Sequence, residues 1–314
     1  MVEPSCDEGR ALDPAELYYA ALDAAYAMNV VTVAELAIAP DSADVSAAWT
    51  AVRDRFALAA ARLDAGAGVV AGAVPAGLER SAATSLDELI ATEQAEPLDL
   101  LGGPMARCRY AVLPDGRSLL AVTTHHCTTD GKSGLTLMQE LVAELAGTPG
   151  PRPVHDLPPR MHDRLPPARR WLHDRRSALE LVRQVSAERG ERAPSFDGLG
   201  WHARHDGPRT PLVITRTLSA ERTAAVARAA KAAGGTVYGL LASRALHVAA
   251  GLAGTSGDLL LTTPVDLRPL LDPPADPASG LFVGIVSTLH GPDASPASVS
   301  AAVRAAADRG EAEL

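Results

Sequence analysis

The stretch Thr123-Thr124-His125-His126-Cys127-Thr128-Thr129-Asp130-Gly131 places two histidines, an aspartate and a glycine within seven positions. Residues 106–113 and 117–124, joined by Pro114-Asp115-Gly116, predict a hairpin that leads into it. Apolar side chains at helical spacing over 135–145 predict a helix after it. We therefore expect the histidines where a strand ends and a helix begins.

Composition and charge bound the class of protein. The chain has 314 residues, 47% of them hydrophobic, which is enough for one large domain or two ordinary ones. A net charge of −9 offers no overall surface for nucleic acid or an anionic membrane. No apolar run is long enough to predict a membrane span. The N-terminus is acidic and does not resemble a signal peptide.

The three cysteines, Cys6, Cys108 and Cys127, have unrelated spacings. They predict neither a disulfide framework nor a paired metal-ligand pattern. Free cysteines are typical of a reducing compartment, so we expect a cytoplasmic protein.

Residues 147–210 are rich in Pro, Arg, His and Asp, and we interpret them as a connection between two lobes. From Arg160 to Arg192 this segment carries nine arginines against five acidic residues. Two interpretations stay open: a docking face for the phosphates of a carrier, or a solvated arginine-rich helix.

A second lobe is expected from about residue 210 onward. Its first strand is predicted from alternating side chains, and Ser219 is the expected cap of its first helix. The expected elements are helices over 219–233 and 236–252 and strands over 211–218, 258–266 and 281–289.

Three interpretations of the histidine stretch compete. In the structural one, His125 and His126 close a strand with satisfied hydrogen bonds. In the metal one, both histidines and Asp130 bind zinc. Adjacent strand residues point to opposite faces, however, and no further nitrogen or sulfur ligand has useful spacing, so we expect no metal. In the general-base one, one histidine faces a cavity with an unprotonated nitrogen, and the other points into the fold.

Asp130, Gly131 and Cys127 complete the general-base interpretation. Asp130 can fix the loop and the imidazole tautomer, and Gly131 can permit a tight backbone entry into the helix. Nothing near Cys127 indicates an activated thiolate, and side-chain alternation turns it away from the His126 face.

The pattern His-His-x-x-x-Asp-Gly between a strand and a helix resembles the signature of the condensation-domain and acyltransferase superfamily. This group includes condensation domains, chloramphenicol acetyltransferase-like enzymes and polyketide-associated acyltransferases. The segment Thr263-Pro264-Val265-Asp266-Leu267-Arg268-Pro269 looks like the second-lobe segment of the last of these, the phthiocerol dimycocerosyl transferase-like enzymes. In them its arginine pairs with the motif aspartate. The resemblance covers nearly the whole chain.

This resemblance implies a mixed α/β (α+β) fold, in which two chloramphenicol acetyltransferase-like lobes form a pseudo-dimer around a central channel. The lobe with the motif is expected over 1–150, the connection over 151–209 and the second lobe over 210–314. About 45 residues follow Arg268, and the Asp-Phe-Gly-Trp-Gly motif of the family is not among them. The second lobe is therefore expected to be incomplete. Two explanations stay open: a second copy or another chain completes its sheet, or the chain is a compact version with a more open channel.

The resemblance also implies an acyltransferase. An acyl group would move from a thioester, on acyl-CoA or on the phosphopantetheine of an acyl or peptidyl carrier protein, to a small-molecule alcohol or amine. The product would be an ester or amide in lipid, polyketide or peptide natural-product biosynthesis. No bound cofactor is implied beyond the thioester co-substrate. The alternative is a weakly active or inactive module that binds a carrier protein or an intermediate.

The resemblance assigns roles to five residues. His126 would be the general base, and no acyl-enzyme would form. His125, Asp130 and Gly131 would support it, and Arg268 would form an ion pair with Asp130.

Overall fold

The structure is a computed structural model. It describes residues 9–23, 27–64, 68–70, 77–150, 157–166, 211–272 and 280–313, together with residues 183 and 187. The chain divides into two compact units. The first comprises Met1–Arg164, Gly207–Thr215 and Leu271–Phe282, and the second comprises Leu165–Asp206, Arg216–Leu270 and Val283–Leu314. The domain limits predicted near residues 150 and 210 stay a prediction.

Most of the predicted connection lies outside the described residues. Of its nine arginines, Arg160, Arg164 and Arg183 are described. Arg160 forms an ion pair with Asp163 at 2.8 Å. The two interpretations of the arginine-rich segment therefore stay predictions.

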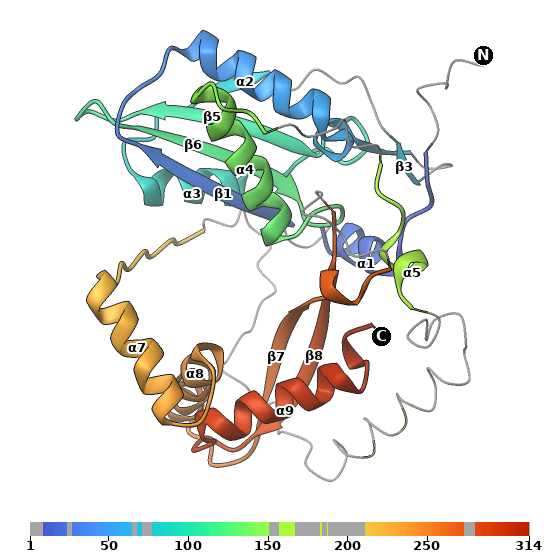
Figure 1. The fold of residues 1–314 in the computed structure, drawn as a ribbon, viewed down its shortest axis with the longest axis vertical. Helices are drawn as coiled ribbons and strands as arrows, with labels where there is room; N and C mark the ends of the chain where they lie inside the picture. The colour runs from blue at the N-terminus through green and yellow to red at the C-terminus, as the bar shows by residue number, and fades with distance from the viewer. Residues whose placement is uncertain are drawn as a thin grey trace. The chain divides into compact units, whose positions relative to one another are not determined.

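The first unit is built on a four-stranded sheet with the order β1-β6-β5-β4 (Figure 1). β6 pairs antiparallel with both β1 and β5, and β4 pairs parallel with β5. A separate two-stranded sheet joins β2 and β3. The strands are β1 (Asn29–Leu36), β2 (Arg62–Asp64), β3 (Gly68–Val70), β4 (Leu78–Arg80), β5 (Ala106–Val112) and β6 (Ser118–His125).

The predicted hairpin before the histidines is confirmed as β5 and β6. Its turn is closed by hydrogen bonds from Leu113 N to Arg117 O at 2.8 Å and from Gly116 N to Leu113 O at 3.1 Å. Gly116 has φ of 85°, in the left-handed region that favours glycine. Every residue of β6 is buried, so the strand that leads to the histidines lies inside the unit.

Helices cover both faces of this sheet. The helices of the unit are α1 (Pro14–Asp23), α2 (Ser42–Arg55), the short 3₁₀ helix η1 (Ala57–Ala60), α3 (Leu86–Ala95), α4 (Gly131–Leu145) and α5 (Met161–Arg164). Leu120 and Val122 of β6 pack in one core cluster with side chains of α2 and α4. Leu119 and Ala121 pack in another, with Leu89 of α3. The alternation follows from the two-residue period of a strand.

The predicted helix after the histidines is confirmed as α4, which begins at Gly131, four residues before the apolar pattern over 135–145. Its first turn lies close to β1: a Cβ added at Gly134 would meet Thr32 Oγ1 at 2.6 Å. Glycine at this position therefore allows α4 to approach the sheet. The position of α4 in turn fixes where the loop before it begins and ends.

A buried ionic cluster lies on the α3 face of the sheet. The side chain of Glu93 is fully buried and accepts hydrogen bonds from Arg107 Nε at 2.9 Å and Arg109 Nη1 at 2.7 Å. Thr123 Oγ1 also donates to this carboxylate. Because each buried charge has a partner, the cluster avoids the cost of an uncompensated ion.

The second unit contains a two-stranded antiparallel sheet in which Leu259 pairs with His290 and Asp266 with Val283. Ala242 and Leu246 of α8 pack with Val299 of α9 in its core cluster. Its elements are α7 (Ala220–Ala232), α8 (Val237–Ala253), β7 (Leu259–Asp266), η4 (Arg268–Leu270), β8 (Val283–His290), α9 (Pro296–Asp308) and η5 (Glu311–Glu313).

Two helices and two strands predicted for this region are confirmed as α7, α8, β7 and β8. Ser219 caps α7 as predicted, since its side chain accepts a hydrogen bond from Arg222 N at 3.2 Å. The strand predicted over 211–218 is wrong. These residues are described as neither helix nor strand, and Leu212 and Ile214 are exposed by 85% and 64%. A segment with alternating apolar and polar side chains forms a strand only where a neighbouring strand pairs with it.

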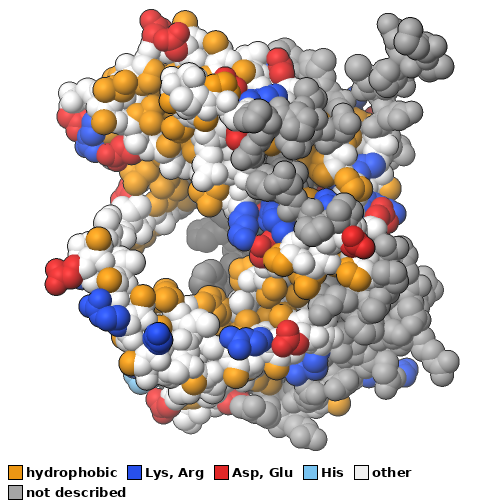
Figure 2. Space-filling model, in the orientation of Figure 1, with side chains coloured by type: hydrophobic (Ala, Val, Ile, Leu, Met, Phe, Trp, Pro, Cys, Tyr) orange, Lys and Arg blue, Asp and Glu red, His pale blue; other side chains and the backbone are white. Residues whose placement is uncertain are grey.

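Apolar side chains also reach the surface of the second unit. Val237, Leu241, Val248 and Leu252 of α8 are exposed. Figure 2 shows apolar and basic side chains mixed on the outer surface of this unit.

Candidate active site

The histidine stretch joins the end of β6 to the start of α4. The backbone turns directly after the strand, because Thr128 N and Thr129 N both donate to His125 O at 3.2 Å. Asp130 then caps α4. The two histidines therefore stand on different structures: His125 is the last strand residue, and His126 is the first residue of the turn.

His125 is fully buried. Its Nδ1 accepts a hydrogen bond from Cys127 N at 3.1 Å, and its Nε2 lies 3.1 Å from Asp23 Oδ1. An Nδ1 that accepts leaves the ring proton of the neutral imidazole on Nε2, where it faces the carboxylate. Burial lowers the pKa of His125 below its usual value, although Asp23 acts in the opposite direction. Nδ1 is thus hydrogen-bonded within the fold, and Nε2 lies buried beside the Asp23 carboxylate.

His126 is only partly buried. Its backbone N donates to Met28 O at 2.7 Å, and its Nδ1 lies 2.9 Å from Thr129 O. A carbonyl oxygen only accepts, so Nδ1 must carry the proton. In the neutral imidazole the lone pair is then on Nε2, and no hydrogen bond to Nε2 occurs among the described residues. This is the protonation state that a general base requires.

An aromatic ring from α1 stacks on His126. The ring centroids of Tyr19 and His126 lie 4.1 Å apart, and the ring planes differ by 15°. Tyr18 packs against Tyr19 edge to face at 5.5 Å. The sequence analysis did not identify Tyr19, because nothing local relates a tyrosine in the first helix to a histidine more than a hundred residues later.

Asp130 is buried, and both of its carboxylate oxygens accept backbone hydrogen bonds. Oδ1 accepts from Ser133 N at 2.9 Å, and Oδ2 accepts from Phe282 N at 3.0 Å. The aspartate therefore caps α4 and also fixes a segment far away in the sequence. The described partner of His126 Nδ1 is Thr129 O rather than Asp130, so the backbone and not this carboxylate sets the tautomer there.

Ser133 holds the same distant segment. Its Oγ donates to Gly280 O at 2.6 Å and accepts from Gly280 N at 2.8 Å. Asp130 and Ser133 together attach residues 280–282 to the first turn of α4. The sequence analysis missed this role of Ser133, because a serine inside a helical pattern has no distinctive spacing.

Gly131 is the first residue of α4, and its expected role is wrong. Its φ is not among the positive values, and an added Cβ would meet nothing within 4 Å. A tight entry into the helix therefore does not require glycine here. A side chain at this position, five residues after His126 in the sequence, would point into open space.

Cys127 is fully buried, and its Sγ lies 3.7 Å from Met105 Sδ. Burial raises the pKa of this thiol strongly. The thiol therefore stays protonated, as expected for a packing residue.

Arg268 belongs to the second unit, where it begins η4 two residues after the last residue of β7. Its backbone N and Nη1 both donate to Asp266 Oδ1, at 3.3 and 3.2 Å. Arg268 and Asp130 belong to different units, so their predicted ion pair stays a prediction.

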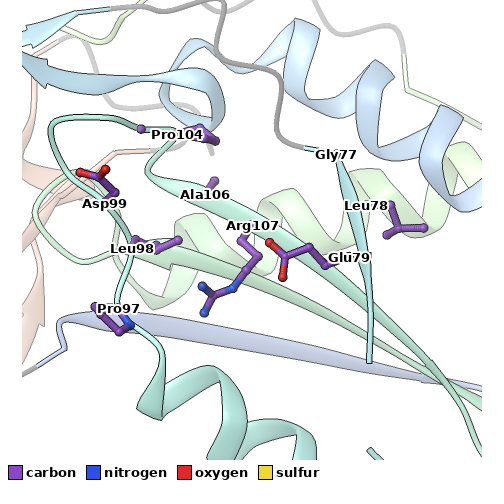
Figure 3. A pocket seen from close by; sticks show the side chains of 10 residues that line it. Gly77, Leu78, Glu79, Pro97, Leu98, Asp99, Pro104, Ala106 and Arg107 are labelled. Atoms are coloured by element: carbon purple, nitrogen blue, oxygen red, sulfur yellow. The ribbon is translucent and has the colours of Figure 1, made fainter. Parts of the chain in front are cut away.

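A pocket of about 280 Å³ opens where β4 and β5 begin. Arg107 and Glu79 extend toward its interior, facing the loop of Pro97, Leu98 and Asp99 (Figure 3). The guanidinium of Arg107 is already engaged by Glu93. The residues that line the pocket include neither histidine of the motif.

Within the described ranges, no three His, Cys, Asp or Glu side chains gather in a way that suits a metal ion. The described helices also include none with the length and apolarity needed to cross a bilayer.

Two comparisons of the sequence with known proteins give matches. Residues 207–311 match the family model described as phthiocerol/phthiodiolone dimycocerosyl transferase C-terminus. Over 122 residues, 38% of this chain, the sequence is 29% identical to the nonribosomal peptide synthetase inpB of Emericella nidulans. Parts of the sequence are therefore similar to a dimycocerosyl transferase family and to a nonribosomal peptide synthetase. The match spans only 5% of the length of that synthetase.

Solved structures support the condensation-like fold over nearly the whole chain. The first condensation domain of the calcium-dependent antibiotic synthetase, solved with a substrate analogue, has a TM-score of 0.65 at 19% identity, covering 97% of this chain and 75% of its own. Polyketide synthase associated protein 5 from Mycobacterium tuberculosis has a TM-score of 0.65 at 20% identity, covering 98% and 75%. The predicted resemblance and the mixed α/β, chloramphenicol acetyltransferase-like fold class are confirmed.

Proposed function

We propose that this protein is an acyltransferase that moves an acyl group from a thioester to a hydroxyl or amine. His126 is its general base, and no acyl-enzyme forms. The observation that carries this proposal is the hydrogen bond from His126 Nδ1 to Thr129 O, because it leaves the Nε2 lone pair available to take a proton. The family match to a dimycocerosyl transferase and the likeness to condensation domains support the reaction class.

In the proposed reaction, the acceptor O–H or N–H gives its proton to His126 Nε2 as its heteroatom attacks the thioester carbonyl carbon. A tetrahedral oxyanion forms and collapses, and the carbon–sulfur bond breaks. The thiolate then takes the proton back from the imidazolium. Nδ1 keeps its hydrogen bond to Thr129 O throughout, and this carbonyl oxygen stabilises the positive charge of the imidazolium.

The donor in this proposal is acyl-CoA or the phosphopantetheine thioester of a carrier protein, and no other cofactor is bound. The acceptor is a small-molecule alcohol or amine in lipid, polyketide or peptide biosynthesis. The similarity to part of a nonribosomal peptide synthetase favours a carrier-bound donor.

The proposal predicts acceptor-dependent release of thiol. The purified protein is incubated with acyl-CoA or acyl-carrier protein and with alcohol or amine acceptors, and the free thiol is measured. We expect His126→Ala to lower the rate about 10²- to 10⁴-fold, the usual contribution of a general base. Comparing the two donors identifies the one that the protein uses.

The matched control is His247→Ala, which removes an exposed imidazole on α8 whose ion-pair partner in the described part of the chain is the exposed Asp293. This variant is expected to keep the wild-type rate. An unchanged rate in His126→Ala would refute the base assignment. Binding of the carrier protein without thiol release by the wild type would favour the alternative, a module that recognises a carrier without turnover.

We also propose that Arg268 pairs with Asp130 and joins the two units. A double-mutant cycle over Asp130→Asn and Arg268→Gln tests the pair by thermal unfolding. A coupling energy of about 1 kcal/mol or more supports it. Strictly additive effects refute it and leave Asp266 as the partner of Arg268.

A further inference from the structure

We propose that Tyr19 positions the imidazole of His126; the catalytic consequence of this role rests on the function proposed above. The two rings stack in parallel, with centroids 4.1 Å apart and planes within 15°. Parallel stacking at this distance is a favourable aromatic contact. Tyr19 is therefore in direct contact with the ring that carries the proposed base.

The stack and the hydrogen bond at Nδ1 restrain different motions of the imidazole. The bond from Nδ1 to Thr129 O fixes which edge of the ring faces the backbone. A hydrogen bond at one edge does not by itself hold the plane of the ring, and a tilt of that plane lengthens and weakens the bond. The flat face of Tyr19 blocks this tilt from one side, so the two contacts together fix the direction of the Nε2 lone pair.

Tyr19 is itself held in place by packing. It is partly buried against a core cluster that includes Leu58, Met105 and Cys127, and Tyr18 contacts it edge to face. Burial raises the pKa of the Tyr19 phenol, with smaller contributions from Tyr18 and Asp130. The ring beside His126 is therefore neutral at neutral pH.

The helix that carries Tyr19 begins in a buried polar network. Asp13 Oδ1 accepts from Ala15 N at 3.1 Å, and Glu16 Oε2 accepts from Asp13 N at 2.7 Å. This is a capping box, with Pro14 at the first helical position. Arg10 donates to both oxygens of the Glu16 carboxylate, at 2.6 and 2.7 Å.

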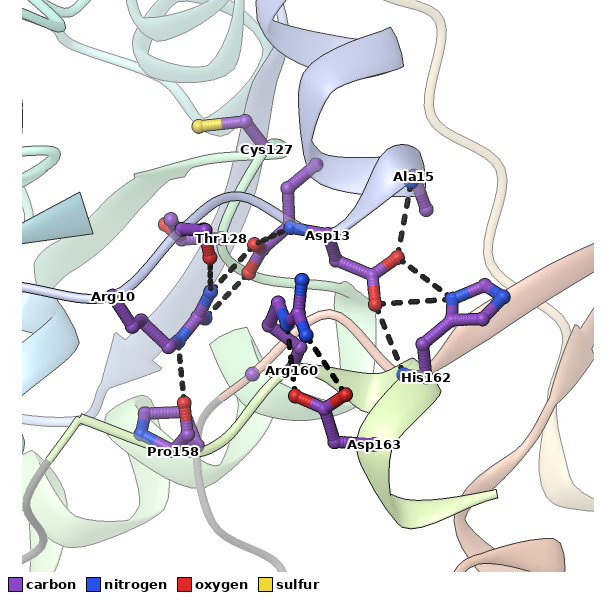
Figure 4. Close-up of polar contacts among 12 residues, drawn as sticks. Arg10, Asp13, Ala15, Cys127, Thr128, Pro158, Arg160, His162 and Asp163 are labelled. Atoms are coloured by element: carbon purple, nitrogen blue, oxygen red, sulfur yellow. Dashed lines mark hydrogen bonds and ion pairs between the residues drawn. The ribbon is translucent and has the colours of Figure 1, made fainter. Parts of the chain in front are cut away.

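His162 fixes the same helix start from a distant part of the chain. Its backbone N donates to Asp13 Oδ2 at 2.9 Å, and its Nδ1 lies 3.1 Å from the same oxygen (Figure 4). Arg10 Nε donates to Pro158 O in the same region. The start of α1 is thus anchored to residues 158–162, and Tyr19 lies in the second turn after this anchor.

The test uses three variants. Tyr19→Leu removes the ring and keeps an apolar side chain, and Tyr19→Phe keeps the ring. Leu17→Ala is the matched control, because Leu17 lies on the same helix, is 59% exposed and takes no part in the ring contacts of Tyr19. Long-range ¹H–¹⁵N spectra of ¹⁵N-histidine protein report the protonation of each ring nitrogen, with His126 signals assigned from His126→Ala. Turnover is measured on the same samples.

In wild type, Tyr19→Phe and Leu17→Ala we expect one His126 tautomer with the proton on Nδ1. In Tyr19→Leu we expect intermediate shifts for both nitrogens, and a kcat about 10- to 100-fold lower with little change in KM. Wild-type shifts and kcat in Tyr19→Leu would overturn the proposal. If Tyr19→Leu does not fold, Tyr19→Met serves as the variant without a ring.

The spectra separate this proposal from the proposed function. Loss of the single tautomer in Tyr19→Leu supports the positioning role even where the wild type shows no turnover. A wild type that turns over while Tyr19→Leu is unaffected refutes the positioning role alone.

Discussion

The last residue of β6 and the first residue of the turn after it are both histidines, and their surroundings are opposite. His125 is fully buried, with Nδ1 bound to Cys127 N and Nε2 facing Asp23. His126 is partly exposed. Its Nδ1 is bound to Thr129 O, and its ring stacks on the ring of Tyr19. Between these two positions, one residue apart, the backbone changes from strand to turn. His126 still donates its backbone N to Met28 O, but it is the first turn residue and its side chain is only partly buried, so this histidine is available for chemistry.

The comparison predicts different stability effects for the two histidines. His125→Ala removes the acceptor of Cys127 N and leaves a cavity, so we expect a loss of about 2–4 kcal/mol in the free energy of unfolding. His126→Ala removes one hydrogen bond and a stacking contact, for a loss of about 1 kcal/mol. Chemical denaturation of both variants measures the difference. Equal losses would show that the two environments are not distinct.

Asp130, which caps α4 beside the histidines, is expected to have the next largest effect on the free energy of unfolding. Asp130→Ala removes the cap of α4 and leaves Phe282 N without an acceptor, so we expect a loss of about 1–3 kcal/mol. Asp130→Asn keeps one carbonyl oxygen and is expected to lose less. Hydrogen exchange at Phe282 N reports the contact directly, and unchanged protection in Asp130→Ala would contradict it.

The buried histidine predicts a pH dependence. An unfolded histidine has a pKa of about 6.5, and burial lowers the pKa of His125 in the folded state. Between these two pKa values the unfolded chain binds the extra proton, so stability falls as pH is lowered through this window. His125 contributes at most about 1.4 kcal/mol per pH unit to the slope of the free energy of unfolding against pH.

His125→Asn is the matched variant for this dependence. An asparagine oxygen can still accept from Cys127 N two residues on, without titrating. The slope between pH 6.5 and 5 is expected to be smaller in this variant than in wild type. The same slope in both proteins would show that His125 does not cause it.

The smallest stability effect is expected at Gly131. A Cβ there meets nothing within 4 Å, and alanine favours a helix, so Gly131→Ala is expected to change the free energy of unfolding by less than about 1 kcal/mol. Because the fold does not need this glycine, any loss of turnover in Gly131→Ala reports on space for a substrate. A large loss of stability would contradict the open surroundings of this residue.

The sequence predicted the hairpin, the helix after the histidines and the kind of family. These features depend on local periodicity, turn residues and a motif of fixed spacing. It did not predict the contacts of Tyr19 with His126, or of Asp130 and Ser133 with residues 280–282. These pairs are separated by more than a hundred residues, and no local pattern records them. The strand predicted over 211–218 failed for the same reason, since alternation does not reveal whether a pairing partner exists.

The account rests on His126 as the base, and chemical rescue tests it most directly. His126→Gly removes the imidazole next to Tyr19, and thiol release is then measured with increasing imidazole in the buffer. We predict that turnover falls about 10²- to 10⁴-fold and returns in proportion to the concentration of unprotonated imidazole. Wild-type turnover by His126→Gly without added imidazole would contradict the account.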